Sequence, residues 1–140
     1  MQQATWLSAG AVCHDMDAEL FKKSIAPMLR ANGFKRTGAT WRNAQAESIA
    51  VLSVHKSRWG SGDFAVNLGI YFRALGNDAS PTDNRCHVQF RLYPDEPSAV
   101  VAMALTWFRD RADLRKAAKL AASDAAKGLV YKEVRAADAT

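Results

Sequence analysis

The sequence predicts an α+β fold, an antiparallel β-sheet with an N-terminal helix and C-terminal helices packed on one face. Three observations support this: apolar residues recur at helical spacing over residues 15–32, apolar and polar residues alternate over 64–73 and 86–93, and helical spacing returns from Ser98. Hairpin-linked strands with one apolar face form a one-sided antiparallel sheet, which helices then cover. A chain of 140 residues suits a single domain.

The first helix is predicted over residues 15–32, with an apolar stripe that includes Phe21, Ile25 and Leu29. Asp15 or Asp17 would cap its start, because an acidic side chain there accepts from free backbone N–H groups. The pair Asn32-Gly33 would end it, since glycine adopts the left-handed turn past a helix end. Pro27 lies inside the pattern and predicts a kink, or a break near Ala26.

Several strands follow. Residues 34–36 and 40–43 are either two short strands or one strand interrupted at Gly38, and residues 48–57 have the β-branched content of a longer strand. A glycine-rich connection, 57–63, joins it to the next strand. The buried face of the 48–57 strand stays undecided because both faces are apolar. The two alternating pairs are Ile49 and Val51, and Leu52 and Val54.

The next two strands alternate clearly. In 64–73 the apolar face holds Phe64, Val66, Leu68, Ile70 and Phe72, and in 86–93 it holds Cys86, Val88, Phe90 and Leu92. We therefore expect Cys86 to be a buried thiol rather than a reactive one.

Pro94 and Pro97 end the sheet region, and a second helix is predicted from Ser98, which would cap it. Trp107 and Phe108 are expected in the core. An alanine-rich third helix is predicted over 111–127.

The predicted organisation is an irregular lead-in over residues 1–14, one α+β domain over 15–127 and a C-terminal tail over 128–140. The last residues also suit a short edge strand or a frayed helix.

The opposite face of the sheet is polar, and it is the first candidate site. By strand parity it gathers histidines, tyrosines, arginines and amides, which suit an anionic or polar partner. The alternative is a solvated outer face of a one-sided sheet. The candidate residues are His55, Asn67, Tyr71, His87, Gln89 and Arg91.

The glycine-rich turn is the second candidate. Lys56, Ser57 and Arg58 precede Trp59, so the cations and backbone amides suit phosphate and the indole suits stacking on a base. The spacing is not that of a P-loop. The alternative is a structural hairpin on which Trp59 covers the core edge.

Catalysis receives little support. Ser57 paired with His55 or His87 needs an acid to orient the base, and Asp63 across the turn is the nearest one. A metal held by the two histidines lacks a third ligand. We therefore predict no enzyme activity, no cofactor and no metal.

The chain carries 19 Lys and Arg against 14 Asp and Glu, a net charge of +5. Between residues 22 and 58 the acidic content is Glu47 alone, so the positive charge concentrates there and predicts where an anionic partner docks. The basic residues of this stretch are Lys22, Lys23, Arg30, Lys35, Arg36, Arg42, Lys56 and Arg58.

No apolar run reaches the roughly 20 residues that span a bilayer, and the start does not resemble a signal peptide. Two cysteines, Cys13 and Cys86, exclude a disulfide framework, so a reducing cytoplasm is predicted and no membrane partner is expected.

Four segments occur in an order that resembles a known family. Residues 29–41 are similar to an opening "GFKRKGxTW" pattern, residues 54–59 to "QKSRW", residues 64–70 to a "VNLG" strand, and residues 86–92 match in place and order. Together they resemble the family called domain of unknown function 4304, over about residues 17–110. The sequence departs at His55, where the family pattern has Gln. The resemblance implies a small bacterial α+β domain without an established activity, and it transfers no catalytic residue.

The predicted function is a non-enzymatic binding domain of the immunity or antitoxin type, which holds an acidic protein partner on the polar sheet face. Bacterial families of this size often include such proteins, which is an association rather than chemistry. The alternative is nucleic-acid or phospholigand binding through the basic N-terminal half. That patch comprises Lys35, Arg36 and Arg42.

Overall fold

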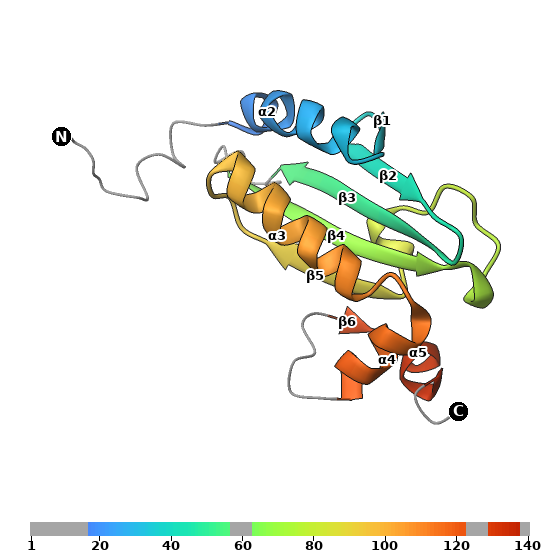
Figure 1. The fold of residues 1–140 in the computed structure, drawn as a ribbon. Coiled ribbons are helices and arrows are strands. Elements are labelled where there is room, and N and C mark those ends of the chain that lie inside the picture. The colour runs from blue at the N-terminus through green and yellow to red at the C-terminus, as the bar shows by residue number, and fades with distance from the viewer. Residues whose placement is uncertain (1–16, 57–62, 123–128, 138–140) are drawn as a thin grey trace.

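A computed structural model describes residues 17–56, 63–122 and 129–137, and it confirms the α+β prediction (Figure 1). Six strands form one antiparallel sheet in chain order, so each strand pairs with the next one along the sequence. The strands are β1 (Lys35–Thr37), β2 (Thr40–Ala44), β3 (Ser48–Lys56), β4 (Phe64–Phe72), β5 (Val88–Leu92) and β6 (Leu129–Val130). The helices are α2 (Ala18–Ala31), α3 (Pro97–Asp110), α4 (Leu114–Ala122) and α5 (Lys132–Ala136), with 3₁₀ turns η1 (Arg73–Leu75) and η2 (Asp83–Arg85).

Helix α2 begins where the sequence predicts. The side chain of Asp17 accepts from the Leu20 amide at 2.9 Å, which satisfies one free donor of the first turn. The helix ends at Ala31, and Gly33 follows with φ +91°, the left-handed conformation expected there. The predicted break near Ala26 is wrong, because α2 continues through Pro27.

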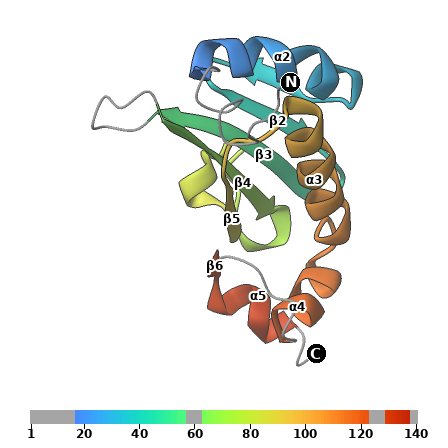
Figure 2. The ribbon, with the colours of Figure 1, turned by 90° about the vertical axis from the view of Figure 1, so that its left-hand side faces the viewer.

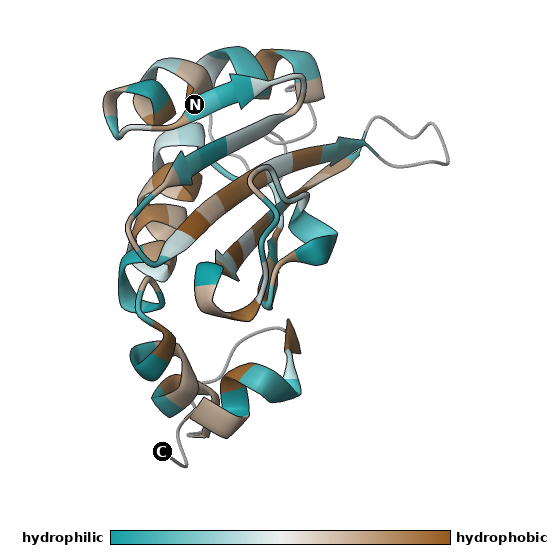
Figure 3. Cartoon of the chain, turned by 90° about the vertical axis from the view of Figure 1, so that its right-hand side faces the viewer, coloured by the Kyte–Doolittle hydropathy of each residue, from teal (hydrophilic) through white to brown (hydrophobic). Residues whose placement is uncertain are grey.

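The two predicted short strands are separate, since Gly38 at φ +64° turns the chain between β1 and β2. The sequence leaves the buried face of β3 undecided, and in the structure both faces are buried. Ala50, Leu52 and Val54 pack in the main core, and Ile49 and Val51 belong to a second cluster on the other face. Figure 3 shows β3 brown along most of its length and teal at its carboxyl end.

Helices α2 and α3 cover one face of the sheet (Figure 2). Helix α3 starts one residue earlier than predicted, with Pro97 in the first turn, where its missing N–H costs nothing. Ser98 is therefore inside the helix and not its cap. Trp107 and Phe108 are buried against this core, as predicted. The alternating apolar face of β4 also lies in the main core.

The second face of the sheet is not simply solvated. Residues 73–87, between β4 and β5, fold back over it, and we call them the covering segment. Cys86 joins Ile49, Val51 and Tyr71 in the second cluster and is fully buried. The prediction that Cys86 faces the same side as Val88 is therefore wrong, because strand parity does not apply before β5 begins. The thiol is nevertheless buried as expected, and burial raises its pKa to about 12.

Residues 129–137, within the stretch predicted as a tail, carry regular structure. Val130 of β6 pairs with Val88 of β5, and α5 follows at once, so both the edge strand and the short helix are present. Val134 of α5 is completely buried in the main core. The predicted lead-in, residues 1–14, lies outside the described residues. No helix in the described part of the chain is long and apolar enough to span a membrane.

Shortening Val134 tests whether this C-terminal segment is part of the domain. Val134→Ala removes two buried methyl groups and leaves a small cavity, so we expect the free energy of unfolding to fall by about 2 kcal/mol. Leu129→Ala is the control, because Leu129 is 57% exposed and should change stability by less than about 0.5 kcal/mol. Urea unfolding measures both, and equal stability of the two variants would contradict the packing.

Candidate binding surface

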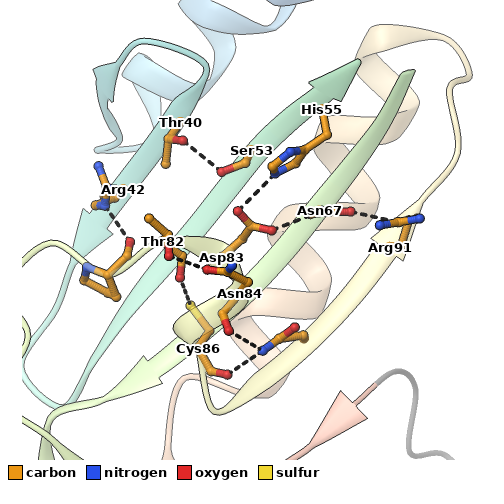
Figure 4. A network of polar contacts seen from close by, with 12 residues as sticks. Thr40, Arg42, Ser53, His55, Asn67, Thr82, Asp83, Asn84, Cys86 and Arg91 are labelled. Carbon is orange, nitrogen blue, oxygen red and sulfur yellow. Dashed lines mark hydrogen bonds and ion pairs between the residues drawn. The ribbon is translucent and has the colours of Figure 1, made fainter. Parts of the chain in front are cut away.

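A chain of polar side chains crosses the second face of the sheet around Asp83 of η2 (Figure 4). His55 Nε2 lies 3.1 Å from Asp83 Oδ1, and Asn67 Nδ2 donates to Asp83 Oδ2 at 3.0 Å. The Asn67 amide oxygen in turn accepts from Arg91 Nε at 2.9 Å. These four residues, which we call the Asp83 cluster, come from β3, β4, η2 and β5.

The cluster has a shielded acidic centre and an exposed basic rim. The side chain of Asp83 is 13% exposed, whereas that of His55 is 52% exposed and Arg91 is exposed too. A hollow of about 260 Å³ opens beside the cluster, lined in part by Asn67, Asp83 and Arg91. The rim therefore offers positioned donors to a partner, while the carboxylate that orients them is held inside.

The covering segment is fastened to the sheet by side chains that donate to its carbonyl oxygens. Arg42 Nε donates to the Pro81 oxygen at 2.8 Å, and Gln89 Nε2 donates to the Cys86 oxygen at 2.9 Å and the Asn84 oxygen at 3.2 Å. The amide group of Gln89 thus positions the segment next to the hollow, which Gln89 also lines.

Tyr71 and His87 are buried, unlike the exposed members of the polar face. The Tyr71 hydroxyl accepts from the Asp78 amide at 3.1 Å, and His87 Nδ1 accepts from the Phe72 amide at 2.9 Å. The His87 ring lies 4.5 Å from the Tyr71 ring and 5.8 Å from that of Tyr131. Burial lowers the pKa of His87, which favours the neutral ring that this hydrogen bond requires. Both side chains therefore stabilise the fold, and because they are buried they offer no direct contact to a partner.

Lys56 follows His55 in β3 and projects to the opposite face, toward α2. Its Nζ lies 3.1 Å from Glu19 Oε2, which also pairs with Lys22 at 2.7 Å. The two cations hold the pKa of Glu19 at about 2. Lys56, a candidate of the glycine-rich turn, therefore lies on the helix side of the sheet, away from the Asp83 cluster.

The titration of Glu19 checks this placement. Because Lys22 and Lys56 stabilise the carboxylate, we expect the Glu19 carboxyl carbon to titrate near pH 2 in NMR spectra. Lys56→Met should raise that pKa toward the usual Glu range, and Lys116→Met, on α4, should leave it unchanged. A Glu19 pKa that is the same in all three proteins would place Lys56 elsewhere.

The predicted basic patch divides between two faces. Lys35 and Arg42 are cross-strand partners, and Arg42 lies opposite Val51 of the second cluster. The side chains of Lys35 and Arg42 therefore lie on the face of the sheet that the covering segment crosses. Arg36 pairs with Trp41 and its guanidinium lies 4.8 Å from that indole ring, on the helix side. Three further candidates, Ser57, Arg58 and Trp59, lie outside the described residues.

The geometry suits hydrogen bonding and charge pairing. His55 is hydrogen-bonded to Asp83, and within the described ranges no serine or cysteine side chain bonds to its ring. Nor do those ranges contain three His, Cys, Asp or Glu side chains grouped closely enough to hold a metal ion. The Asp83 cluster itself offers an oriented set of hydrogen-bond donors on the surface of the sheet.

Asp83 is the central residue that sequence reasoning missed. It stands in a polar stretch, 76–84, that reads as a loop, and no periodic pattern marks one of its aspartates. The one available signal is that strand parity places His55, Asn67 and Arg91 on the same polar face, where the strands offer no acceptor to the Asn67 NH₂ group. A carboxylate from a neighbouring loop supplies it.

The fold defines this protein as a small α+β domain in which six strands pair in chain order and side chains of the sheet hold the covering segment by hydrogen bonds. The family model described as Domain of unknown function (DUF4304) matches residues 25–130, so the chain belongs to this family. Neither a curated protein nor a solved structure matches the chain.

Proposed function

We propose that this protein is a non-enzymatic binding module that holds an acidic segment of a partner protein on the Asp83 cluster. The observation that supports this most is the hydrogen-bonded series from Asp83 through Asn67 to Arg91, which orients a guanidinium on an exposed surface. Side chains that are already oriented lose less conformational entropy when they bind, so such an array favours recognition.

The charge of this surface favours a carboxylate-rich partner. Arg91 uses Nε for Asn67, and its terminal N–H groups bond to nothing else in the described part of the chain. Guanidinium groups pair with carboxylates in a geometry that gives both strength and specificity. Lys35 and His55 lie on the same face, and Asp83 is shielded by its own partners.

The immunity or antitoxin role and the cytoplasmic location are part of the same proposal. An immunity-type protein acts by occupying a partner's surface, which requires binding groups and no catalytic set. The buried free thiol of Cys86 and the low cysteine content are consistent with a reducing compartment.

Co-purification of charge-reversal variants from the native host tests the proposal. Arg91→Glu should reduce recovery of a stoichiometric partner at least tenfold, because it replaces a donor with a like charge facing the partner's carboxylates. Arg115→Glu on α4 makes the same charge change at an exposed site away from the cluster and should leave recovery unchanged. A partner retained by Arg91→Glu, or no stoichiometric partner at all, would refute the proposal.

Nucleic-acid or phospholigand binding remains the alternative and has less support. Its described basic residues face two sides of the sheet, since Arg36 and Lys56 turn toward the helices. Binding of this kind should weaken steeply with salt because counterions are released. Strong, salt-sensitive binding of DNA or RNA by the wild type, lost in Lys35→Glu, would favour it over the protein partner.

A further inference from the structure

A second hollow, of about 490 Å³, lies on the opposite side of the molecule from the Asp83 cluster, between β5, α3 and α4. Its volume falls within the range of sites that hold small molecules. The apolar part of its lining is Phe90, Leu92, Met103, Trp107 and Leu120. The rings of Phe90 and Trp107 are nearly parallel, with their centres 6.1 Å apart.

This apolar hollow contains a buried cation. Arg111, which caps α3, also lines the hollow and is only 7% exposed. Its guanidinium carbon lies 4.9 Å from the centre of the Trp107 ring, and Nη1 reaches the Trp107 carbonyl oxygen at a long 3.4 Å. No ion pair within 4 Å joins Arg111 to an acidic side chain in the described ranges, although buried arginines are usually paired.

Two further observations point to a missing acceptor. Trp107 Nε1 is buried and has no hydrogen-bond partner among the described residues. Burial also lowers the pKa of Arg111, and the charge of Asp110, which acts in the opposite direction, offsets this only in part. Asp110 lines the same hollow, but its carboxylate is half exposed and lies 3.8 Å from Arg109, outside ion-pair distance of Arg111.

We propose that this hollow binds a small amphiphilic monocarboxylate, with the carboxylate on Arg111 and the apolar tail against Phe90 and Trp107. A carboxylate accepts charge-assisted hydrogen bonds from the guanidinium, and it supplies a counter-charge in direct contact, which Asp110 of the described residues does not. The tail gains by removing apolar surface from water. This site is independent of the Asp83 cluster and of the proposed partner.

Octanoate is the probe, and octan-1-ol is its neutral counterpart of equal chain length. Titration into the ¹⁵N-labelled full chain should shift the Trp107 indole N–H signal saturably, with the signal assigned through Trp107→Phe. Octanoate should bind ten- to a hundredfold more tightly than octan-1-ol, the gain expected of a charged hydrogen bond.

Arg111→Met should remove that preference while keeping the apolar stem, and Arg115→Met on α4 should leave it intact. An absent or non-saturable Trp107 shift, equal binding of acid and alcohol, or unchanged octanoate affinity in folded Arg111→Met would each overturn the proposal. If Arg111→Met does not fold, the acid–alcohol comparison in the wild type still decides it.

Discussion

Gly69→Ala is expected to destabilise the protein by about 2 kcal/mol. A methyl group at Gly69 of β4 would lie 2.6 Å from Cys86 Sγ and 2.7 Å from Cys86 Cβ, far inside van der Waals contact. Over-packing of this kind typically costs 1–3 kcal/mol. Alanine is otherwise preferred to glycine in a strand, so a loss of stability reports the close approach of the covering segment to the sheet.

A double-mutant cycle isolates that contact. Cys86→Gly removes the two nearest atoms that the new methyl group would meet and leaves the Asp83 carbonyl oxygen at 3.3 Å, so Gly69→Ala should cost at least about 1 kcal/mol less in the Cys86→Gly background. Chemical denaturation of the wild type, both single variants and the double variant measures the cycle. Strictly additive effects would mean that the covering segment does not lie against Gly69.

His87→Ala is expected to cost about 3 kcal/mol. It removes a ring packed between Tyr71 and Tyr131 and leaves the buried Phe72 amide without its acceptor. An unsatisfied buried donor alone costs about 1–3 kcal/mol. His87→Asn retains an acceptor near the position of Nδ1 and should lose less. A substitution with little effect would indicate an exposed side chain instead.

The pH dependence of stability gives His87 a second signature. Its folded-state pKa is lowered, so below the ordinary histidine pKa near 6.5 the unfolded chain binds a proton that the native protein does not. The stability contribution is therefore full above that pH and declines as pH falls toward the lowered pKa. His87→Asn should lack this part of the decline, measured by urea unfolding between pH 7 and 5. An identical pH profile in the variant would contradict the buried neutral ring.

The sequence predicts most of the regular structure because it is periodic. The alternation in β4 places Phe64 and Ile70 in the core and Asn67 on the other face, and the structure confirms each. Asp17 and Gly33 bound the first helix through local cap chemistry, which the neighbouring residues determine.

The covering segment could not be predicted in this way. Its position depends on contacts between distant residues, such as Arg42 with the Pro81 oxygen and Cys86 with Gly69, and no local pattern encodes them. Strand parity therefore placed His87 on an open polar face and left Asp83 in a loop. At the C-terminus the sequence suggests an edge strand or a short helix, but it does not show that Val134 is buried, because that burial depends on tertiary packing.

Hydrogen exchange of the complex recovered by co-purification tests the proposed function most directly. If the partner binds the Asp83 cluster, backbone amides near Asn67, Asp83 and Arg91 should exchange more slowly in the complex than in the free protein. Amides of α3 near Met103, on the other side of the sheet, should be unaffected. Protection confined to α3, with the Asp83 cluster unchanged, would contradict the assignment of the binding surface.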